Sequence, residues 1–187
     1  MPKRWQPPDD WRRITAIDAH SAGEPLRVIT SGFPKLSGKT ILEKRRQARQ
    51  HHDHLRRALM WEPRGHSDMY GCILTEPESD DGHVGVLFLH NQGFSTMCGH
   101  GIIGLVKVGI ECGILDVSGQ EPVIRIDTPA GRVTATAHIE QGRVKRVSFL
   151  NVASFLLEKD LEVQVPELGR IRCDIAFGGA FYAYLEA

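Results

Sequence analysis

Alternating apolar and polar positions run along much of the chain, which predicts a sheet-rich protein. Residues 14–19 and 26–30 are typical of two strands joined by a Gly-Glu-Pro turn, so they predict a hairpin. Residues 69–74 and 84–90 predict two more strands across an acidic turn. Beyond position 122 the pattern predicts strands throughout, at 123–127, 132–139, 144–150, 161–165, 171–176 and 181–185.

Two stretches carry helical spacing instead. No Gly or Pro occurs from 39 to 61, and one helical face there collects apolar residues and a histidine, which predicts a single long helix. That face is made of Ile41, Ala48, His52, Leu55 and Leu59. We expect its basic opposite face, Lys44, Arg45, Arg49 and Arg56, to be solvated and not to bind nucleic acid. From 99 to 112 apolar residues occur almost all round, which predicts a buried helix enclosed by a sheet and ending at Gly113.

Charge and composition exclude several classes of partner. Lys plus Arg and Asp plus Glu number 23 each, so no overall field favours nucleic acid or an anionic membrane. The longest apolar runs are far too short to span a bilayer, and the N-terminus lacks an apolar signal region. We therefore expect a soluble, cytoplasmic protein. Four well-separated cysteines without a CxxC motif indicate reduced thiols; they are Cys72, Cys98, Cys112 and Cys173.

The most informative chemistry lies at Cys98, where a turn leads into the second predicted helix. Unpaired N–H groups and the positive end of the helix dipole would lower the thiol pKa from about 8.5 toward neutrality. The same N–H groups can hold a carboxylate, and Gly99 and Gly101 allow a ligand to approach closely. One site could therefore bind the carboxylate of an amino acid and present a base to its α-carbon.

Three other interpretations of Cys98 compete with this one. A free cysteine in an apolar setting is commonly an inert core residue. A metal site would combine Cys98 and His100 with Cys112 or with the polar cluster 51–54, but this is poor zinc spacing, and we expect no metal and no organic cofactor. Acyl transfer with His100 as the base is disfavoured, because a side chain two positions along a helix start should point to a different face.

Two further segments are rich in acid and base groups. Asp18-Ala-His20-Ser-Ala-Gly-Glu24-Pro25-Leu-Arg27 surrounds a tight turn, and Glu62-Pro-Arg-Gly-His-Ser-Asp-Met-Tyr-Gly71 follows the long predicted helix. Turn-stabilising hydrogen bonds and ion pairs are the more ordinary explanation for each segment. A direct contact with substrate is the alternative.

In order along the chain, five motifs together resemble the proline racemase family. The two segments above are followed by Met97-Cys-Gly-His-Gly101, Asp127-Thr-Pro-Ala-Gly131 and Asp174-Ile-Ala-Phe-Gly-Gly179. The resemblance implies an α+β fold similar to diaminopimelate epimerase, in which each of two lobes wraps a mixed sheet around a central helix. Residues 1–11 would be a tail, 12–142 the first lobe and 143–187 the beginning of a second lobe whose remainder is absent.

The same resemblance implies roles for individual residues. Cys98 would be the base, the backbone of Gly99 and His100 would bind the substrate carboxylate, and Tyr70 and Phe88 would wall the ring pocket. A second catalytic residue would follow beyond residue 187. A cysteine there implies racemase or 2-epimerase chemistry, whereas a threonine implies a trans-3-hydroxyproline dehydratase.

The pair His90 and Asn91 favours the dehydratases, because a His-Asn pair is similar to their sequence here and could hydrogen-bond a ring hydroxyl. We therefore predict cofactor-independent dehydration of trans-3-hydroxy-L-proline. The alternatives are a proline racemase or 4-hydroxyproline 2-epimerase and, from another class, a truncated binding module without catalysis. The expected partners are a small-molecule substrate and, as one option, a second copy in a homodimer. The 187 residues alone should be poorly active.

Overall fold

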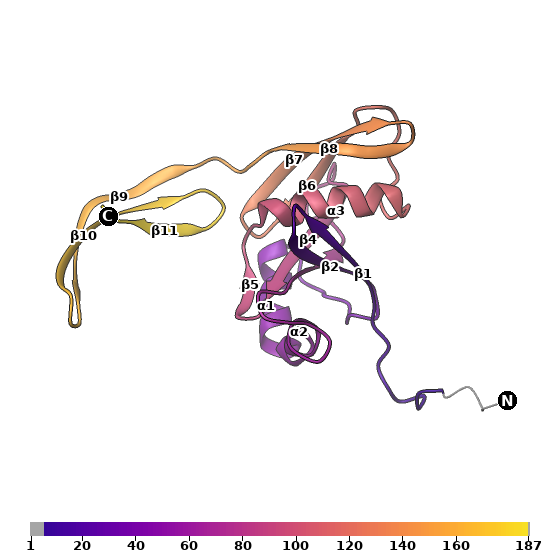
Figure 1. Cartoon of the computed structure of the whole chain (residues 1–187), viewed down its shortest axis with the longest axis horizontal. Helices are drawn as coiled ribbons and strands as arrows, with labels where there is room; N and C mark the ends of the chain where they lie inside the picture. Colours follow the sequence, from indigo (N-terminus) through magenta and orange to yellow (C-terminus); the bar gives the residue numbers. More distant parts are fainter. Residues whose placement is uncertain (1–5, 187) are drawn as a thin grey trace.

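A curled sheet around one helix forms the centre of the computed structural model, which describes residues 6–186 (Figure 1). The sheet runs in the order β1-β2-β3-β4-β6-β7-β8, with β5 paired to β4. Its strands are β1 (Thr15–Ser21), β2 (Glu24–Ser31), β3 (Tyr70–Thr75), β4 (Val84–His90), β5 (Gly93–Ser95), β6 (Val123–Thr128), β7 (Gly131–Glu140) and β8 (Arg143–Leu150). The pairs β2–β3 and β4–β6 are parallel and the others antiparallel, which confirms the predicted mixed sheet.

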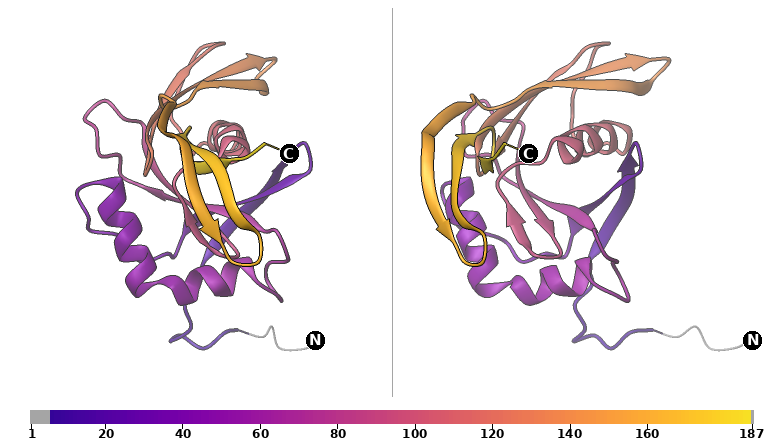
Figure 2. Two further views of the ribbon diagram at one scale, coloured as in Figure 1. Left: turned by 90° about the vertical axis from the view of Figure 1, so that its left-hand side faces the viewer. Right: turned by 60° about the vertical axis from the view of Figure 1, so that its left-hand side comes forward.

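Helix α3 (Gly99–Glu111) lies inside the curl, with β1–β2 on one side and β7–β8 on the other (Figure 2). The two faces of β4 explain how one sheet serves two cores. Val86 and Phe88 belong to the cluster that includes α3, whereas Leu87 and Leu89 belong to a second cluster on the opposite face. Period-two alternation on a strand buried on both sides produces this division. The predicted central helix is thereby confirmed, and Gly113 ends it with a φ of +68°.

The long helix predicted over residues 39–61 is wrong, because the chain forms two helices there. Helix α1 (Ile41–His51) begins with a capping box between Thr40 and Glu43. Helix α2 (Asp53–Met60) follows after a single intervening residue. His52 separates them with a non-helical φ of −128° and ψ of 14°. Both helices pack on the outer face of the sheet. Tertiary packing can override the local helix propensity of a segment that contains no Gly or Pro.

The sequence predicted that the basic face of these helices is solvated, and this is wrong for two of its residues. Lys44 and Arg56 are both buried. Lys44 donates to the carbonyl of Glu76 at 2.5 Å, while Arg56 pairs with Asp53 and donates to the carbonyl of His90 at 2.8 Å. Arg45 donates to the carbonyl of Phe94. These cations therefore donate hydrogen bonds to backbone carbonyl oxygens at or near the ends of strands. The spacing of basic residues along the sequence does not reveal such contacts.

The predicted hairpin of β1 and β2 is confirmed, but the predicted turn residues Glu24 and Pro25 already belong to β2. Ala22 and Gly23 form its two-residue turn with φ values of 52° and 102°, the left-handed conformations that such turns require. Of the predicted tail 1–11, residues 1–5 lie outside the described part. The rest contains a turn in which the N–H of Trp11 donates to the carbonyl of Pro8 at 3.1 Å.

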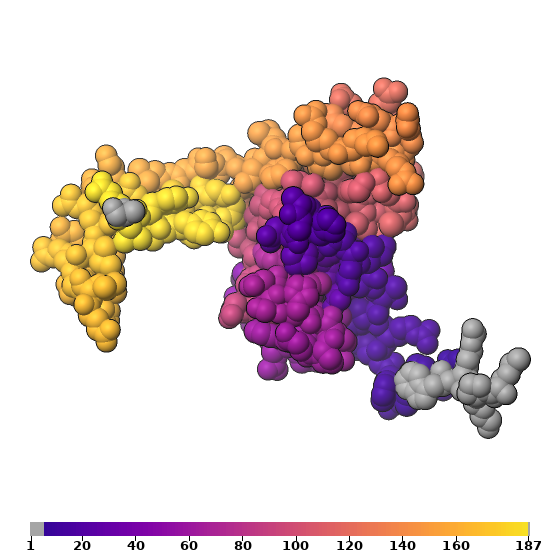
Figure 3. Space-filling model, in the orientation of Figure 1, coloured from indigo at the N-terminus to yellow at the C-terminus, as the bar shows by residue number. Residues whose placement is uncertain are grey.

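A separate antiparallel sheet projects from this body as an arm (Figures 1 and 3). It consists of β9 (Phe155–Val165), β10 (Gly169–Phe177) and β11 (Phe181–Tyr184). Large apolar side chains on the arm are exposed, among them Leu156, Phe181 and Tyr184. Strand β8 belongs to the central sheet and pairs with β7, so the expected lobe boundary at 143 falls between two paired strands. Among residues 6–186, no helix is both long and apolar enough to cross a membrane.

Candidate active site

A cleft of about 650 Å³ opens at the N-terminus of α3. Five segments surround it: the β1–β2 hairpin, the loop after α2 with the start of β3, the β4–β5 hairpin, the start of α3 with the residues before it, and the β10–β11 turn. Its lining residues are Glu24, Trp61, Ser67, Asp68, Met69, Tyr70, His90, Asn91, Gln92, Ser95, Met97, His100, Ala180 and Tyr182. The fold thus gathers four predicted site residues, namely Tyr70, His90, Asn91 and His100, around one opening.

Cys98 is the N-cap residue of α3, with an extended backbone (φ −150°, ψ 113°). Its Sγ accepts a hydrogen bond from the N–H of Gly101 at 3.3 Å, and only 8% of the residue is exposed. Burial raises the pKa of the thiol, and the hydrogen bonds from Gly101 and Tyr70 lower it by less. The expected fall in pKa is therefore wrong in direction, because desolvation outweighs the helix N-terminus. The resting group is a thiol that needs a proton acceptor.

His100 lies against Cys98, contrary to the expectation that its side chain would point elsewhere. Its Nδ1 is 3.3 Å from the Sγ of Cys98, and its Nε2 is 3.3 Å from the carbonyl oxygen of Pro25. Because Cys98 is a cap residue with extended backbone, helical spacing does not apply between positions 98 and 100. A carbonyl only accepts, so Nε2 carries the proton in the neutral ring and Nδ1 is free to accept the thiol proton.

The ring of Tyr70 forms a wall beside this pair. It meets His100 edge-on with 5.0 Å between ring centroids and stacks on His90 at 5.5 Å. Its hydroxyl shares a hydrogen bond of 2.5 Å with Ser95 and also contacts Cys98. Burial, and next the nearby Cys98, raise the pKa of Tyr70, so the hydroxyl stays protonated and can donate.

His90 presents a neutral ring to the cleft. Burial lowers its pKa, and the charges of Arg56 and Arg45 lower it further. Its Nδ1 accepts from the N–H of Gln92 at 3.2 Å, which leaves the proton on Nε2. His90 can therefore donate one hydrogen bond to a ligand.

Two other predicted residues do not present free polar or ring surface to the cleft. Phe88 is completely buried behind the start of α3, and a Cβ at Gly101 would come within 2.6 Å of its ring. Asn91 is also buried, and its side-chain amide donates to the carbonyls of Met60 at 2.9 Å and His66 at 3.0 Å. Asn91 thus fixes the loop that forms one wall of the cleft.

The segment 18–27 is held by the ion pairs and turn bonds that its composition suggested. Arg27 binds both carboxylate oxygens of Asp18, at 2.8 and 2.7 Å, and also donates to the carbonyls of Leu59 and Arg64. The same hairpin supports the site directly. Ser21 donates to the backbone carbonyl of His100 at 3.0 Å, in addition to the contact between His100 and Pro25.

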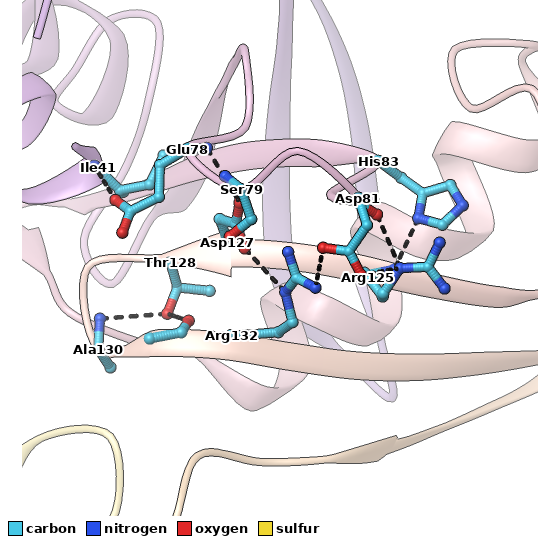
Figure 4. Close-up of polar contacts among 11 residues, drawn as sticks. Ile41, Glu78, Ser79, Asp81, His83, Arg125, Asp127, Thr128, Ala130 and Arg132 are labelled. Carbon is cyan, nitrogen blue, oxygen red and sulfur yellow. Dashed lines mark hydrogen bonds and ion pairs between the residues drawn. The ribbon is translucent and has the colours of Figure 1, made fainter. Parts of the chain in front are cut away.

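Asp127 organises a polar network on β6 and β7 (Figure 4). One of its carboxylate oxygens accepts from the N–H groups of Glu78 at 3.0 Å and Ser79 at 2.9 Å. The other accepts from Nε of Arg132 at 3.1 Å, and Arg132 reaches Asp81 at 2.6 Å. The network attaches the acidic turn after β3 to the β6–β7 hairpin.

That hairpin contacts the cysteine loop through Thr96. The N–H of Ala130 donates to the carbonyl of Thr96 at 3.2 Å, and Thr128 stabilises the turn that contains Ala130. The hydroxyl of Thr96 donates to the carbonyl of Gly179 in the β10–β11 turn. Two residues before Cys98, the chain is thus anchored to the central sheet and to the arm.

Comparison with known proteins identifies the family. The family model described as proline racemase matches residues 16–187, which is most of the chain. The chain belongs to the proline racemase family. It is 48% identical over 99% of its length to a trans-3-hydroxy-L-proline dehydratase of Colwellia psychrerythraea and 53% identical over 92% of its length to one of Bacillus thuringiensis. It covers 53% and 52% of those proteins, so it spans about half the length of these relatives.

A solved family structure has the same fold. The hydroxyproline epimerase of Agrobacterium vitis, with bound trans-4-hydroxy-L-proline, superposes with a TM-score of 0.84 at 28% identity. The match covers 94% of this chain and 52% of that protein. Membership of the proline racemase family and its fold were therefore predicted correctly from the ordered motifs.

Several cleft residues in this member of the proline racemase family were not singled out from the sequence. Glu24 and Asp68 lay within recognised motifs, and Asp68 has a φ of 63°, which marks it as unusual only once the backbone is known. Ser95 and Tyr182 had no sequence signal, because β5 was not predicted and Tyr182 reaches the cleft through the arm.

The remaining thiols differ from Cys98 in their surroundings. Cys72 is completely buried in β3, where burial raises its pKa, and Cys173 is buried in β10. Cys112 is exposed at the C-terminal end of α3. Within residues 6–186, no group of three or more His, Cys, Asp or Glu side chains is arranged to hold a metal ion.

Proposed function

We propose that this chain forms the first half of a cofactor-independent enzyme that removes water from trans-3-hydroxy-L-proline. Cys98 takes the α-proton, the 3-hydroxyl leaves as water, and the product is a pyrroline-2-carboxylate. The observation that carries the proposal is the position of Cys98, which caps α3 beside a cleft and has Gly101, Tyr70 and His100 in contact with its Sγ. The names of the 48% and 53% identical relatives support the choice of substrate.

The start of α3 supports a binding mode for the substrate carboxylate. The first N–H groups of a helix have no partner within the helix and favour an anion, so Gly99 and His100 would donate to this group. Glu24 and Asp68 line the same cleft, and their carboxylates suit the secondary ammonium of the ring. The ring would then lie against Tyr70.

His90 is better placed than Asn91 to bind the ring hydroxyl. The Nε2–H of His90 is available to donate, whereas the side-chain amide of Asn91 already binds two backbone carbonyls. Asn91 would act by holding the cleft wall, and Phe88 by supporting the ring of Tyr70, 6.5 Å away, from behind.

We also propose that a second lobe begins in the arm, at about Phe155, and that a residue of that lobe forms the opposite wall. Two observations support this: β8 is part of the central sheet, and the arm exposes large apolar side chains that need covering. A cytoplasmic location and a homodimer stay predictions of the sequence.

Racemisation or 2-epimerisation is the second candidate function, favoured by the similarity to the Agrobacterium vitis epimerase. Both reactions begin with loss of the α-proton and differ in whether the proton is returned or a hydroxyl leaves. A non-catalytic binding module would retain the carboxylate site without turnover.

One experiment separates these functions. The full-length protein is incubated in deuterated water with trans-3-hydroxy-L-proline, trans-4-hydroxy-L-proline or L-proline, and the products are followed by NMR and chiral chromatography. We expect water loss from the 3-hydroxy compound alone. Inversion of proline or 4-hydroxyproline with intact 3-hydroxyproline would support the second candidate, and no turnover of any compound would favour the binding module.

A further inference from the structure

The two reacting groups of the proposed substrate lie on one face of its ring. In trans-3-hydroxy-L-proline the hydroxyl and the carboxyl group are on opposite faces, and the α-hydrogen is opposite the carboxyl group. The α-hydrogen and the hydroxyl therefore share the face that the base must approach. Hydroxide is a poor leaving group, so a proton donor is needed on the same side as Cys98.

His100 is the described residue best placed to supply that proton. Its Nδ1 is 3.3 Å from the Sγ of Cys98, so a ring that presents its α-hydrogen to Sγ presents the neighbouring C3 substituent within reach of the imidazole. Pro25 accepts from Nε2, which lies 3.7 Å from Sγ, and Ser21 holds the backbone carbonyl. The imidazole is thus held with Nδ1 as the ring nitrogen nearer Sγ.

The other donors around the cleft are less suited to this task. His90 can bind the hydroxyl through its Nε2–H, but burial and the charges of Arg56 and Arg45 lower its pKa and disfavour the imidazolium that would supply a proton. The pKa of Tyr70 is raised by burial, which makes its phenol a weaker acid than an ordinary tyrosine. Ser95 carries an alcohol that is weaker still, and its oxygen is engaged by Tyr70 at 2.5 Å. Glu24 also lines the cleft, but its side chain is assigned above to the ring ammonium.

We propose, on the basis of the proposed function, that the His100 imidazole is the general acid that protonates the departing 3-hydroxyl. The thiol proton of Cys98 first moves to Nδ1 of His100, giving a thiolate and an imidazolium. The thiolate then takes the α-proton, the C2–H electron pair forms the C2–C3 double bond, and the C3–O bond breaks. The hydroxyl leaves with the proton of Nδ1 as water.

The cycle balances without any other reactant. It ends with Cys98 as a thiol and His100 as a neutral ring, which is the state in which it began. Its net result is one cyclic enamine, which can tautomerise to the imine, and one water. The buried thiol with a raised pKa is consistent with this cycle, because the thiolate is needed only while His100 holds its proton.

A change of leaving group tests the role of His100. In the full-length protein, His100→Gln retains an amide that can donate to Pro25 but removes the acid. Fluoride leaves without being protonated, so trans-3-fluoro-L-proline bypasses the need for an acid while it keeps the same α-proton and stereochemistry. Elimination of fluoride still needs a proton acceptor for Cys98, so both reactions should slow, but we expect kcat/KM for trans-3-hydroxy-L-proline to fall by at least about 10-fold more than kcat/KM for elimination of fluoride.

His138→Asn is the matched control, because His138 lies on the outer side of β7 and bonds Glu121 and Ser148, away from the cleft. It should lose nothing with either substrate. If His100→Gln lowers kcat/KM by the same factor for both substrates, the proposal is overturned. His100 would then act only as the proton acceptor of Cys98 or as a structural residue. Unchanged dehydration would also overturn it and assign the acid role to Cys98 itself. Failure of the wild type to dehydrate 3-hydroxyproline would instead refute the proposed function.

Discussion

Asp127 offers a sharp test of how a buried carboxylate supports the cysteine loop. Its side chain is 5% exposed and accepts three hydrogen bonds, from Glu78, Ser79 and Arg132. Asp127→Ala removes all three acceptors and leaves two backbone N–H groups and one guanidinium without this partner. Hydrogen bonds to a charged group contribute about 1.5 to 3 kcal/mol each, and the turn can partly relax toward water. We expect a loss of about 3 kcal/mol in the free energy of unfolding.

Asp81 provides the matched control in the same network. It binds the same Arg132 at 2.6 Å, but its side chain is 63% exposed (Figure 4). Solvent screens an exposed ion pair, so Asp81→Ala should lower the free energy of unfolding much less than Asp127→Ala does. Urea unfolding followed by circular dichroism measures both variants. Equal costs for the two would show that the burial of Asp127 does not determine its contribution, and the reasoning would fail.

Three further predictions concern the immediate surroundings of the thiol. In mass mapping after iodoacetamide treatment, alkylation of Cys98 should reach half its maximal rate at a higher pH than an ordinary cysteine does, because burial raises its pKa and only the thiolate reacts. Tyr70→Phe should move that midpoint to still higher pH, since it removes a hydrogen bond that lowers the pKa; a shift to lower pH would contradict this. Gly101→Ala should lower the thermal midpoint more than Gly99→Ala, because its Cβ would lie 2.6 Å from the ring of Phe88 and that of Gly99 would lie 3.4 Å from the nearest atom. Equal midpoints would count against this packing.

The parts of the fold that could be predicted are those in which the local pattern and the final packing agree. Helix α3 is apolar nearly all round because the sheet encloses it, and Gly113 ends it as its sequence position indicated. The break at His52 could not be predicted, because no Gly or Pro marks it and it lies between two helices that both pack on the sheet. The burial of Lys44 is similar, since its partner is a backbone carbonyl distant in sequence.

At the site, the residue types were predictable and their geometry was not. The motif located Cys98 at a helix start, but the direction of its pKa shift depends on burial, which a motif does not carry. His100 was expected to point away under helical spacing, yet the extended backbone of Cys98 brings the two side chains together. Asn91 lines the cleft, as its motif suggested, but the sequence did not show that its side-chain amide binds carbonyls at the end of α2 and in the loop after it.

The central claim is that the Cys98 thiolate takes the α-proton of a hydroxyproline, and replacement of the sulfur tests it most directly. Dehydration of trans-3-hydroxy-L-proline is measured for full-length Cys98→Ser and Cys72→Ser, with folding checked by circular dichroism. A hydroxyl is a far weaker base than a thiolate, so Cys98→Ser should lose at least about 1,000-fold in kcat. Cys72 is a buried thiol in β3, and the folded fraction of Cys72→Ser should keep the wild-type kcat. A folded Cys98→Ser enzyme that dehydrates the substrate at the wild-type rate would contradict the account.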